Sequence, residues 1–283
     1  MRILITGAHG QVGQALVAAL QDTHTLLRPQ RNELDISHST VVGRIIEQAP
    51  ELVIHSAAWT NVDACAREPD QALLINGLGT KHVVLACQAL DIPLVYVSTN
   101  EVFDGSATRP YLEYDQPRPI NPYAYSKWVG EQVVQQLLRK FYIVRVAWVF
   151  GGPRNFVQTM VRLAQERSEL AVVDDEIGNP TFAPDIAEGI ARLIEQPAYG
   201  TYHLVNEGHC SRHEFAREIL QQVGRSDVHV RPIKLAEYKR DSTPPPFGAL
   251  RNFVAATDLG IQLQPWQTAL RTFLAQLSQP HDA

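Results

Sequence analysis

A tyrosine and a lysine four residues apart form the pair in this sequence best suited to acid–base chemistry. Tyr123 and Lys127 follow Pro122, which marks the start of a helix, and residues four apart share one helical face. Tyr125, two residues from the lysine, is expected to point elsewhere. An unperturbed phenol has a pKa of about 10, and a neighbouring ammonium would lower that pKa by stabilising the phenolate. The spacing predicts a site in which Tyr123 exchanges protons.

A hydroxyl-bearing segment, Ser98-Thr99-Asn100, follows the short apolar run 94–97. Ligands of parallel α/β sheets bind beyond the carboxyl ends of the strands, so this segment is expected to face a ligand. The Thr99 hydroxyl would hydrogen bond a substrate carbonyl and hold it against the phenol. A simple turn closed by a hydroxyl group is the alternative interpretation.

Three glycines near the N-terminus have the spacing of a phosphate-binding turn. Gly7, Gly10 and Gly13 come after the apolar run 2–6 and open a helical pattern that runs to about Leu20. Glycine allows a tight turn, close approach of backbone amides to a pyrophosphate and close helix–strand packing. In this strand–turn–helix context the turn predicts dinucleotide binding, with an ordinary βα turn as the alternative.

The end of the second expected strand indicates which dinucleotide binds. Residues 28–32 include Arg28 and Arg31, and no carboxylate appears until Glu33. A carboxylate here would accept from a ribose hydroxyl, whereas arginine suits a 2′-phosphate. The stretch therefore favours NADPH, with NADH as the second choice, unless both arginines simply face solvent. The positive ring of the oxidised cofactor would add to the lowering of the Tyr123 pKa.

Short apolar strands alternate with longer helical patterns, which is typical of βαβ units and a parallel sheet. We predict an α/β fold with a doubly wound parallel sheet of Rossmann type and a smaller C-terminal α/β substrate lobe. The expected domains are 1–150 for the dinucleotide and 151–283 for the substrate, with some exchange of chain between them. The first half supplies expected strands at 2–6, 25–28, 51–55, 94–97 and 142–146 and helices ending near 20 and at 39–48, 70–90 and 123–139; the second supplies helices at 183–195 and 213–223.

Composition excludes several classes of protein. The 283 residues carry a formal net charge of -5 and no basic block, so nucleic acid is not an expected partner. Three cysteines without paired spacing indicate free thiols in a reducing compartment. The apolar run at the N-terminus is too short for a signal-peptide core or a membrane span, and we expect a cytoplasmic protein without a membrane partner.

No metal site is expected. His209, Cys210 and His213 lie close together, but no fourth ligand follows at a recognisable spacing, and Ser211 is a good helix cap. The run 174–176 is interpreted as an exposed acidic turn. His55, at the end of a strand, is interpreted as a packed or surface histidine.

These motifs together resemble the dTDP-4-dehydrorhamnose reductase family, a group of extended short-chain dehydrogenases/reductases, over nearly the whole chain. The resemblance implies NADPH-dependent reduction of the 4-keto group of a nucleotide-diphospho-sugar, dTDP-4-dehydro-L-rhamnose. Relatives are often homodimers. The matching pieces are the three glycines, 34–36, 57–63, Asn76, Ser98-Thr99, 102–105, 123–127, 147–149, Asn155-Phe156, 173–175 and 178–181.

The resemblance also implies roles for individual residues. Tyr123 would be the general acid, Thr99 would polarise the ketone, and Lys127 would hold the nicotinamide ribose and tune Tyr123. Together with Tyr123 and Lys127, the expected cofactor-binding residues are Gly7, Gly10, Gln11, Val12, Gly13, Arg31, Asp35, Ile36, Ala57, Ala58 and Asn76. The expected substrate-binding residues are Thr60, Val62, Thr99, Asn100, Glu101 and Trp148.

Two departures from the family pattern concern the substrate. Asn100-Glu101 stands where the family usually has Asp-Tyr, and 244–250 lacks the arginine, asparagine and serine of the family's Arg-Pro-x-Asn-Ser-x-Leu segment. Two alternatives therefore stay open. One is an NADP-binding, non-catalytic regulatory subunit like that of methionine adenosyltransferase. The other is a nucleotide-sugar epimerase or dehydratase with tightly held NAD, against which Arg28 and Arg31 argue.

Overall fold

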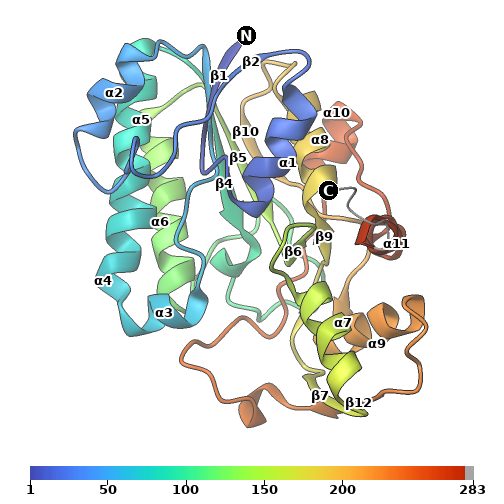
Figure 1. Ribbon diagram of the computed structural model, residues 1–283. Helices are drawn as coiled ribbons and strands as arrows, with labels where there is room; N and C mark the ends of the chain where they lie inside the picture. The colour runs from blue at the N-terminus through green and yellow to red at the C-terminus, as the bar shows by residue number, and fades with distance from the viewer. Residues whose placement is uncertain (278–283) are drawn as a thin grey trace.

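A parallel sheet forms the centre of the computed structural model, which describes residues 1–277 (Figure 1). The order across the sheet is β10-β5-β4-β3-β1-β2, so the chain reverses its progress between β1 and β3. This arrangement confirms the predicted doubly wound sheet. The strands are β1 (Arg2–Thr6), β2 (Thr25–Leu27), β3 (Leu52–His55), β4 (Leu94–Thr99), β5 (Phe141–Val146) and β10 (Gly200–His203).

Helices cover both faces of this sheet, as Figure 1 shows. One face packs against α2 (Val41–Glu47), α5 (Gly79–Leu90) and α6 (Pro122–Leu137), and the other against α1 (Gln11–Leu20) and α8 (Ala183–Leu193). All six residues of β4 are buried, which explains why the central strands are continuously apolar. In the first half of the chain, the expected elements lie within about two residues of the observed ones.

The expected helix at 70–90 is longer and less regular than predicted. It contains α4 (Pro69–Ala72), a π-helical segment (Leu73–Leu78) and α5. The whole run is apolar and long enough to cross a membrane, but half of its 18-residue apolar stretch is buried inside the protein. Packing against α6 and the sheet accounts for this apolar composition. The preceding helix α3 (Val62–Arg67) was not predicted from the sequence.

The second lobe has its own core, built around a cluster of phenylalanines. Of the two helices expected after residue 150, the one at 183–195 is observed as α8 and the one at 213–223 as α9 (Arg212–Gln222). The expected cap Ser211 forms a capping box with Glu214 at the start of α9. The remaining elements of this lobe are α7 (Phe156–Glu166), α11 (Trp266–Leu277), β7 (Glu169–Val173) paired with β12 (His229–Ile233), β6 (Val149–Phe150) with β9 (Thr181–Phe182), and β8 (Ile177–Gly178) with β11 (Cys210–Ser211). The helix α10 (Phe253–Leu259) packs instead against β10 of the central sheet.

Elements from both sides of residue 150 build the central sheet. β10 pairs with β5, and α8 packs against α1. Neither β10 nor this use of α8 was predicted from the sequence. The division into 1–150 and 151–283 stays a prediction.

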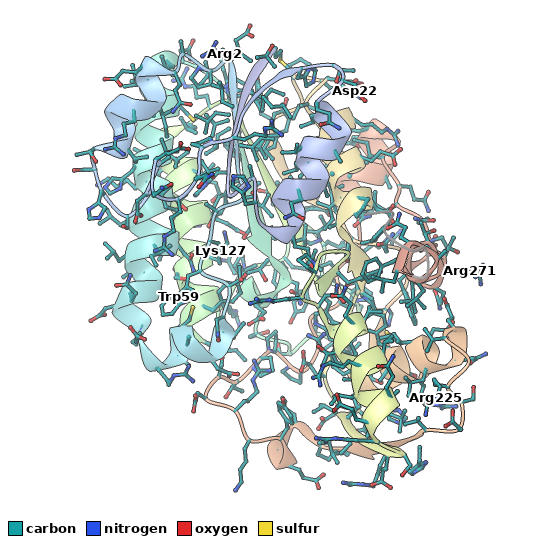
Figure 2. All side chains as sticks on the ribbon, viewed as in Figure 1. Arg2, Asp22, Trp59, Lys127, Arg225 and Arg271 are labelled. Atoms are coloured by element: carbon teal, nitrogen blue, oxygen red, sulfur yellow. The ribbon has the colours of Figure 1, made fainter. Side chains whose placement is uncertain are left out.

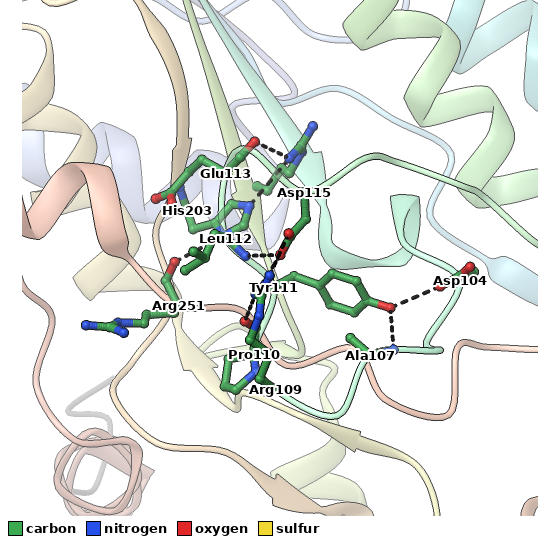
Figure 3. Close-up of polar contacts among 11 residues, drawn as sticks. Asp104, Ala107, Arg109, Pro110, Tyr111, Leu112, Glu113, Asp115, His203 and Arg251 are labelled. Atoms are coloured by element: carbon green, nitrogen blue, oxygen red, sulfur yellow. Dashed lines mark hydrogen bonds and ion pairs between the residues drawn. The ribbon is translucent and has the colours of Figure 1, made fainter.

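A long loop between β4 and α6 is held by polar contacts (Figure 3). The Tyr111 hydroxyl donates to Asp104 Oδ1 at 3.0 Å, and the Tyr111 ring stacks on Phe103. Farther along, Glu113 Oε1 accepts from the backbone amide of His203 on β10 at 3.2 Å. The loop is therefore fixed to the sheet before it delivers the chain to the start of α6.

Two fully buried histidines predict acid sensitivity. Burial lowers the pKa of both His55 and His203 from 6.5 to about 3, so the unfolded chain binds protons that the fold does not. Their contribution to stability is complete above about pH 6.5 and is lost as the pH falls. We expect His203→Gln to reduce the loss in free energy of unfolding between pH 7 and pH 5 by about 2 kcal/mol, measured by urea denaturation. The exposed His229→Gln should keep the wild-type loss; an unchanged loss in His203→Gln would contradict the assignment.

Candidate active site

The glycine turn closes tightly against the neighbouring strand. Gly7 has φ +70°, and a Cβ there would lie 2.7 Å from the backbone nitrogen of Ala57. A Cβ on Gly13 would lie 2.0 Å from the carbonyl oxygen of Gly7. Side chains are excluded at both positions, so the turn leaves room at the start of α1 for a phosphate group and its backbone amides.

Two adjoining cavities open at this carboxyl edge of the sheet, and they share Gly7, Gly10 and Ala58. The first, which we name the distal cavity, has a volume of about 480 Å³. The predicted cofactor residues that line it are Gly7, Gly10, Arg31, Asp35, Ile36, Ala57 and Ala58.

The second, which we name the reaction cavity, has a volume of about 400 Å³. It brings together the predicted catalytic residues Thr99, Tyr123 and Lys127 with the glycine turn. It is also lined by the remaining predicted cofactor and substrate residues Gln11, Val12, Gly13, Ala58, Thr60, Val62, Asn100, Glu101 and Trp148.

Tyr123 lies in the first turn of α6. The Asn121 side chain caps this helix by accepting from the Ala124 amide at 2.8 Å. Burial raises the pKa of the Tyr123 phenol, and the nearby Glu101 charge raises it further, whereas a hydrogen bond with Thr99 lowers it. Burial and Glu101 therefore place the pKa of Tyr123 above its usual value in this structure, opposite to the expected lowering. A phenol that stays protonated is suited to donating a proton.

Lys127 is buried one helical turn after Tyr123 on α6, near the middle of the molecule (Figure 2). Its Nζ donates to the Val97 carbonyl at 2.8 Å and lies 4.1 Å from the centroid of the Tyr96 ring. Burial lowers the pKa of Lys127 to about 7, and the Glu131 charge one turn along α6 opposes that shift. The ammonium is thus held in place by a backbone carbonyl, and the charge of the Glu131 carboxylate favours its protonated form.

That carboxylate belongs to a buried ion pair. Glu131 Oε2 lies 2.7 Å from Arg145 Nη2, and the two side chains are 1% and 3% exposed. Ser98 Oγ also donates to Glu131 Oε1 at 2.5 Å. The pair therefore joins α6 to β5 and to the end of β4, directly before Thr99.

The two departures from the family pattern meet in space. Asn100 Nδ2 donates to the Gly248 carbonyl at 2.9 Å, and a Cβ on Gly248 would lie 2.4 Å from the same nitrogen. Asn100 lines the reaction cavity, so this hydrogen bond fixes the 244–250 segment next to that cavity. Glu101 accepts from Asn121 Nδ2 at 2.8 Å, and burial raises the pKa of its carboxyl group.

Asn76 differs in position from the other expected cofactor residues. It is 1% exposed and does not line either cavity. Its Oδ1 accepts from the Trp59 amide at 2.7 Å, and its Nδ2 donates to the Trp59 carbonyl and to Ser126 Oγ. Asn76 therefore positions the segment that carries Ala57 and Ala58.

Arg212 also lines the reaction cavity, although the sequence did not single it out. Its partner Glu176 is 7% exposed, so the interpretation of 174–176 as an exposed acidic turn is wrong at this position. The turn folds inward because Glu176 pairs with Arg212, the first residue of α9. No local sequence pattern predicts that contact.

The histidines and cysteines set aside above have structural surroundings. His55 bonds Thr6 and Thr80, which agrees with a packed histidine, and His213 Nε2 lies 3.0 Å from the Val230 carbonyl. All three cysteines are buried free thiols. Within residues 1–277, no group of three or more His, Cys, Asp or Glu side chains is arranged to hold a metal ion.

Comparison with known proteins identifies the relatives of this site. The family model described as RmlD substrate binding domain matches residues 1–279. The chain belongs to the dTDP-4-dehydrorhamnose reductase family. The family resemblance drawn from the sequence is therefore confirmed.

Individual members of the reductase family cover this chain almost completely. A dTDP-4-dehydrorhamnose reductase of Mycobacterium tuberculosis is 35% identical over 97% of this chain and 92% of its own length. A crystal structure of the Clostridium acetobutylicum reductase has a TM-score of 0.96 and 36% identity, covering 99% of this chain and 100% of that one. The Bacillus anthracis reductase, solved in complex with NADP, has a TM-score of 0.93 and 37% identity, covering 97% and 99%.

Proposed function

We propose that this protein uses NADPH to reduce the 4-keto group of dTDP-4-dehydro-L-rhamnose, giving dTDP-L-rhamnose. The observation that carries the proposal is the meeting of Thr99, Tyr123 and Lys127 with Trp148 in one cavity beside the glycine turn. Relatives at 35–37% identity that are named for this reaction support it, and one of them was solved with NADP.

The residues of the two cavities fit an NADP dinucleotide. The side-chain-free turn at Gly7, Gly10 and Gly13 suits the pyrophosphate, and Ala57 and Ala58 leave space along the distal cavity. Arg31 lines the distal cavity, where a 2′-phosphate would need a positive charge. When bound there, NADPH supplies the hydride for the reduction.

The reacting side chains divide the rest of the work. The Thr99 hydroxyl donates to the C4 carbonyl oxygen and polarises it. Tyr123 gives its phenolic proton to that oxygen as the hydride reaches C4, so the ketone becomes an alcohol and the tyrosine becomes a phenolate. Lys127 stabilises the phenolate with its positive charge until solvent restores the proton. The raised pKa of Tyr123 keeps the proton available before reaction.

Arg31 predicts the preference between the two cofactors. We expect Arg31→Ala to weaken NADPH binding roughly tenfold while NADH binding changes little, because only NADPH carries the 2′-phosphate. Fluorescence titration of both reduced cofactors measures this difference. Arg28→Ala is the matched control, since Arg28 is exposed and does not line the distal cavity. Equal weakening of NADPH and NADH in Arg31→Ala would contradict the assignment.

Turnover tests the proposed reaction and separates it from the alternatives. The full chain, mixed with NADPH and dTDP-4-dehydro-L-rhamnose, should consume NADPH and form one equivalent of dTDP-L-rhamnose. NAD that copurifies tightly with the protein would instead favour an epimerase or dehydratase. NADP binding without turnover, together with a stoichiometric partner enzyme, would favour a regulatory subunit. A cytoplasmic homodimer stays a prediction.

A further inference from the structure

Arg212 and Lys127 are the two cationic side chains that line the reaction cavity within the described part of the chain. Lys127 is 3% exposed and its Nζ is bonded to the Val97 carbonyl, so it serves the reacting end of the cavity. Resting on the proposed function, we infer that Arg212 binds the diphosphate group of the nucleotide-sugar substrate. This assigns Arg212 as a specificity-determining residue of the second lobe.

The orientation of the Arg212 guanidinium is fixed by its neighbours. Its central carbon lies 3.6 Å from the centroid of the Trp148 ring. Its Nε and Nη2 both lie 3.1 Å from Glu176 Oε1, and the Arg212 side chain is 24% exposed. The edge of the guanidinium that bears Nη1 makes no bond within residues 1–277. A fixed planar group with one edge unused is suited to binding an oxyanion.

Trp148 itself has an unusual backbone conformation and is closely packed. Trp148 has φ +40°, a left-handed conformation that non-glycine residues rarely adopt. The indole packs over Gly178, where a Cβ would lie 2.5 Å from Trp148 Cε2. A strained residue packed on a required glycine and covered by an arginine indicates a surface shaped for a ligand.

Charge explains why the ligand group is the diphosphate. Glu101 also lines the reaction cavity, and a negative group entering it needs a compensating cation. The Glu176 charge raises the pKa of Glu101 and the Arg212 charge lowers it, so both groups act on the Glu101 carboxyl. A diphosphate brings negative charge and several oxygens that accept from a guanidinium, whereas the sugar and the base are neutral.

Equilibrium binding tests the inference without requiring turnover. Calorimetric titration compares dTDP with thymidine, using the full chain saturated with NADP⁺. Arg212→Gln should weaken dTDP binding roughly 10- to 100-fold and leave thymidine binding unchanged. Arg217→Gln, an exposed position on the same helix, should match the wild type for both ligands. Thermal unfolding and NADPH affinity check that both variants are folded.

Three results would overturn the inference: unchanged dTDP affinity in Arg212→Gln, a parallel loss for dTDP and thymidine, or wild-type protein that shows no diphosphate-dependent binding with dTDP, UDP or GDP. The proposed reaction can fail separately. Wild-type protein that binds dTDP through Arg212 but does not reduce dTDP-4-dehydro-L-rhamnose would uphold the role of Arg212 and refute the reaction.

Discussion

Tyr123→Phe should lower kcat for the reduction of dTDP-4-dehydro-L-rhamnose by about 10³-fold, within the range for the loss of a general acid. The substitution removes only the phenolic hydroxyl and keeps the ring in its buried position on α6. NADPH affinity and thermal stability should therefore stay close to those of the wild type. Stopped-flow measurement of NADPH consumption, with the cofactor and the sugar both saturating, isolates this effect on kcat.

A second tyrosine on the same helix provides the control for this substitution. Tyr125 is 48% exposed and does not line the reaction cavity, so Tyr125→Phe should retain wild-type kcat. A Tyr123→Phe variant that binds NADPH and turns over at more than about a tenth of the wild-type rate would contradict the general-acid role.

Glu131→Gln should lower the free energy of unfolding by about 3–5 kcal/mol. The substitution leaves Arg145, which is 3% exposed, as an uncompensated buried charge, and it weakens the bond from Ser98. Urea denaturation followed by circular dichroism measures the loss as a shift in the midpoint. Glu131 also opposes the lowering of the Lys127 pKa, so this pKa should fall further in the variant. The alkaline limb of the pH–rate profile should therefore move to lower pH.

An exposed ion pair provides the matched control for stability. Arg162 and Glu166 on α7 are 60% and 54% exposed, so Glu166→Gln should change the free energy of unfolding by about 0.5 kcal/mol or less. Equal stability of Glu131→Gln and Glu166→Gln would show that the buried pair does not carry the energy assigned to it.

The glycine turn and the Tyr123–Lys127 pair were predictable from the sequence because each depends on local spacing. Gly7 directly follows β1 and Gly13 lies in the first turn of α1, while Tyr123 and Lys127 lie one helical turn apart. The alternation of apolar strands and helices likewise predicted the sheet strands that the first half of the chain supplies. The comparisons confirm the family and the fold that these local patterns indicated.

The contacts that support the site could not be predicted in the same way. Asn100 and Gly248 are 148 positions apart, and Arg212 and Glu176 are 36 apart, so only the fold brings them together. The missed helix α7 did carry a signal, since its buried Val157, Met160 and Ala164 recur every three or four residues. The preceding Gly151-Gly152-Pro153 is typical of a loop, so this helical periodicity was not recognised.

The Tyr123 pKa shows how a correct residue can be predicted for an incomplete physical reason. The sequence places Lys127 one turn away but does not reveal how deeply the phenol is buried or that Glu101 faces it. Burial and a nearby carboxylate both favour the neutral phenol, and together they outweigh the expected lowering. For a reductase the outcome is favourable, because Tyr123 must begin the reaction with its proton.

Transfer of isotope from cofactor to sugar is the most direct test of the central claim. The wild-type protein, given NADPH deuterated at C4 of the nicotinamide and dTDP-4-dehydro-L-rhamnose, should form dTDP-L-rhamnose with one deuterium at C4 of the sugar, as seen by NMR and mass spectrometry. Product with deuterium at any other carbon, or no reduced sugar from protein that binds NADPH, would contradict the account.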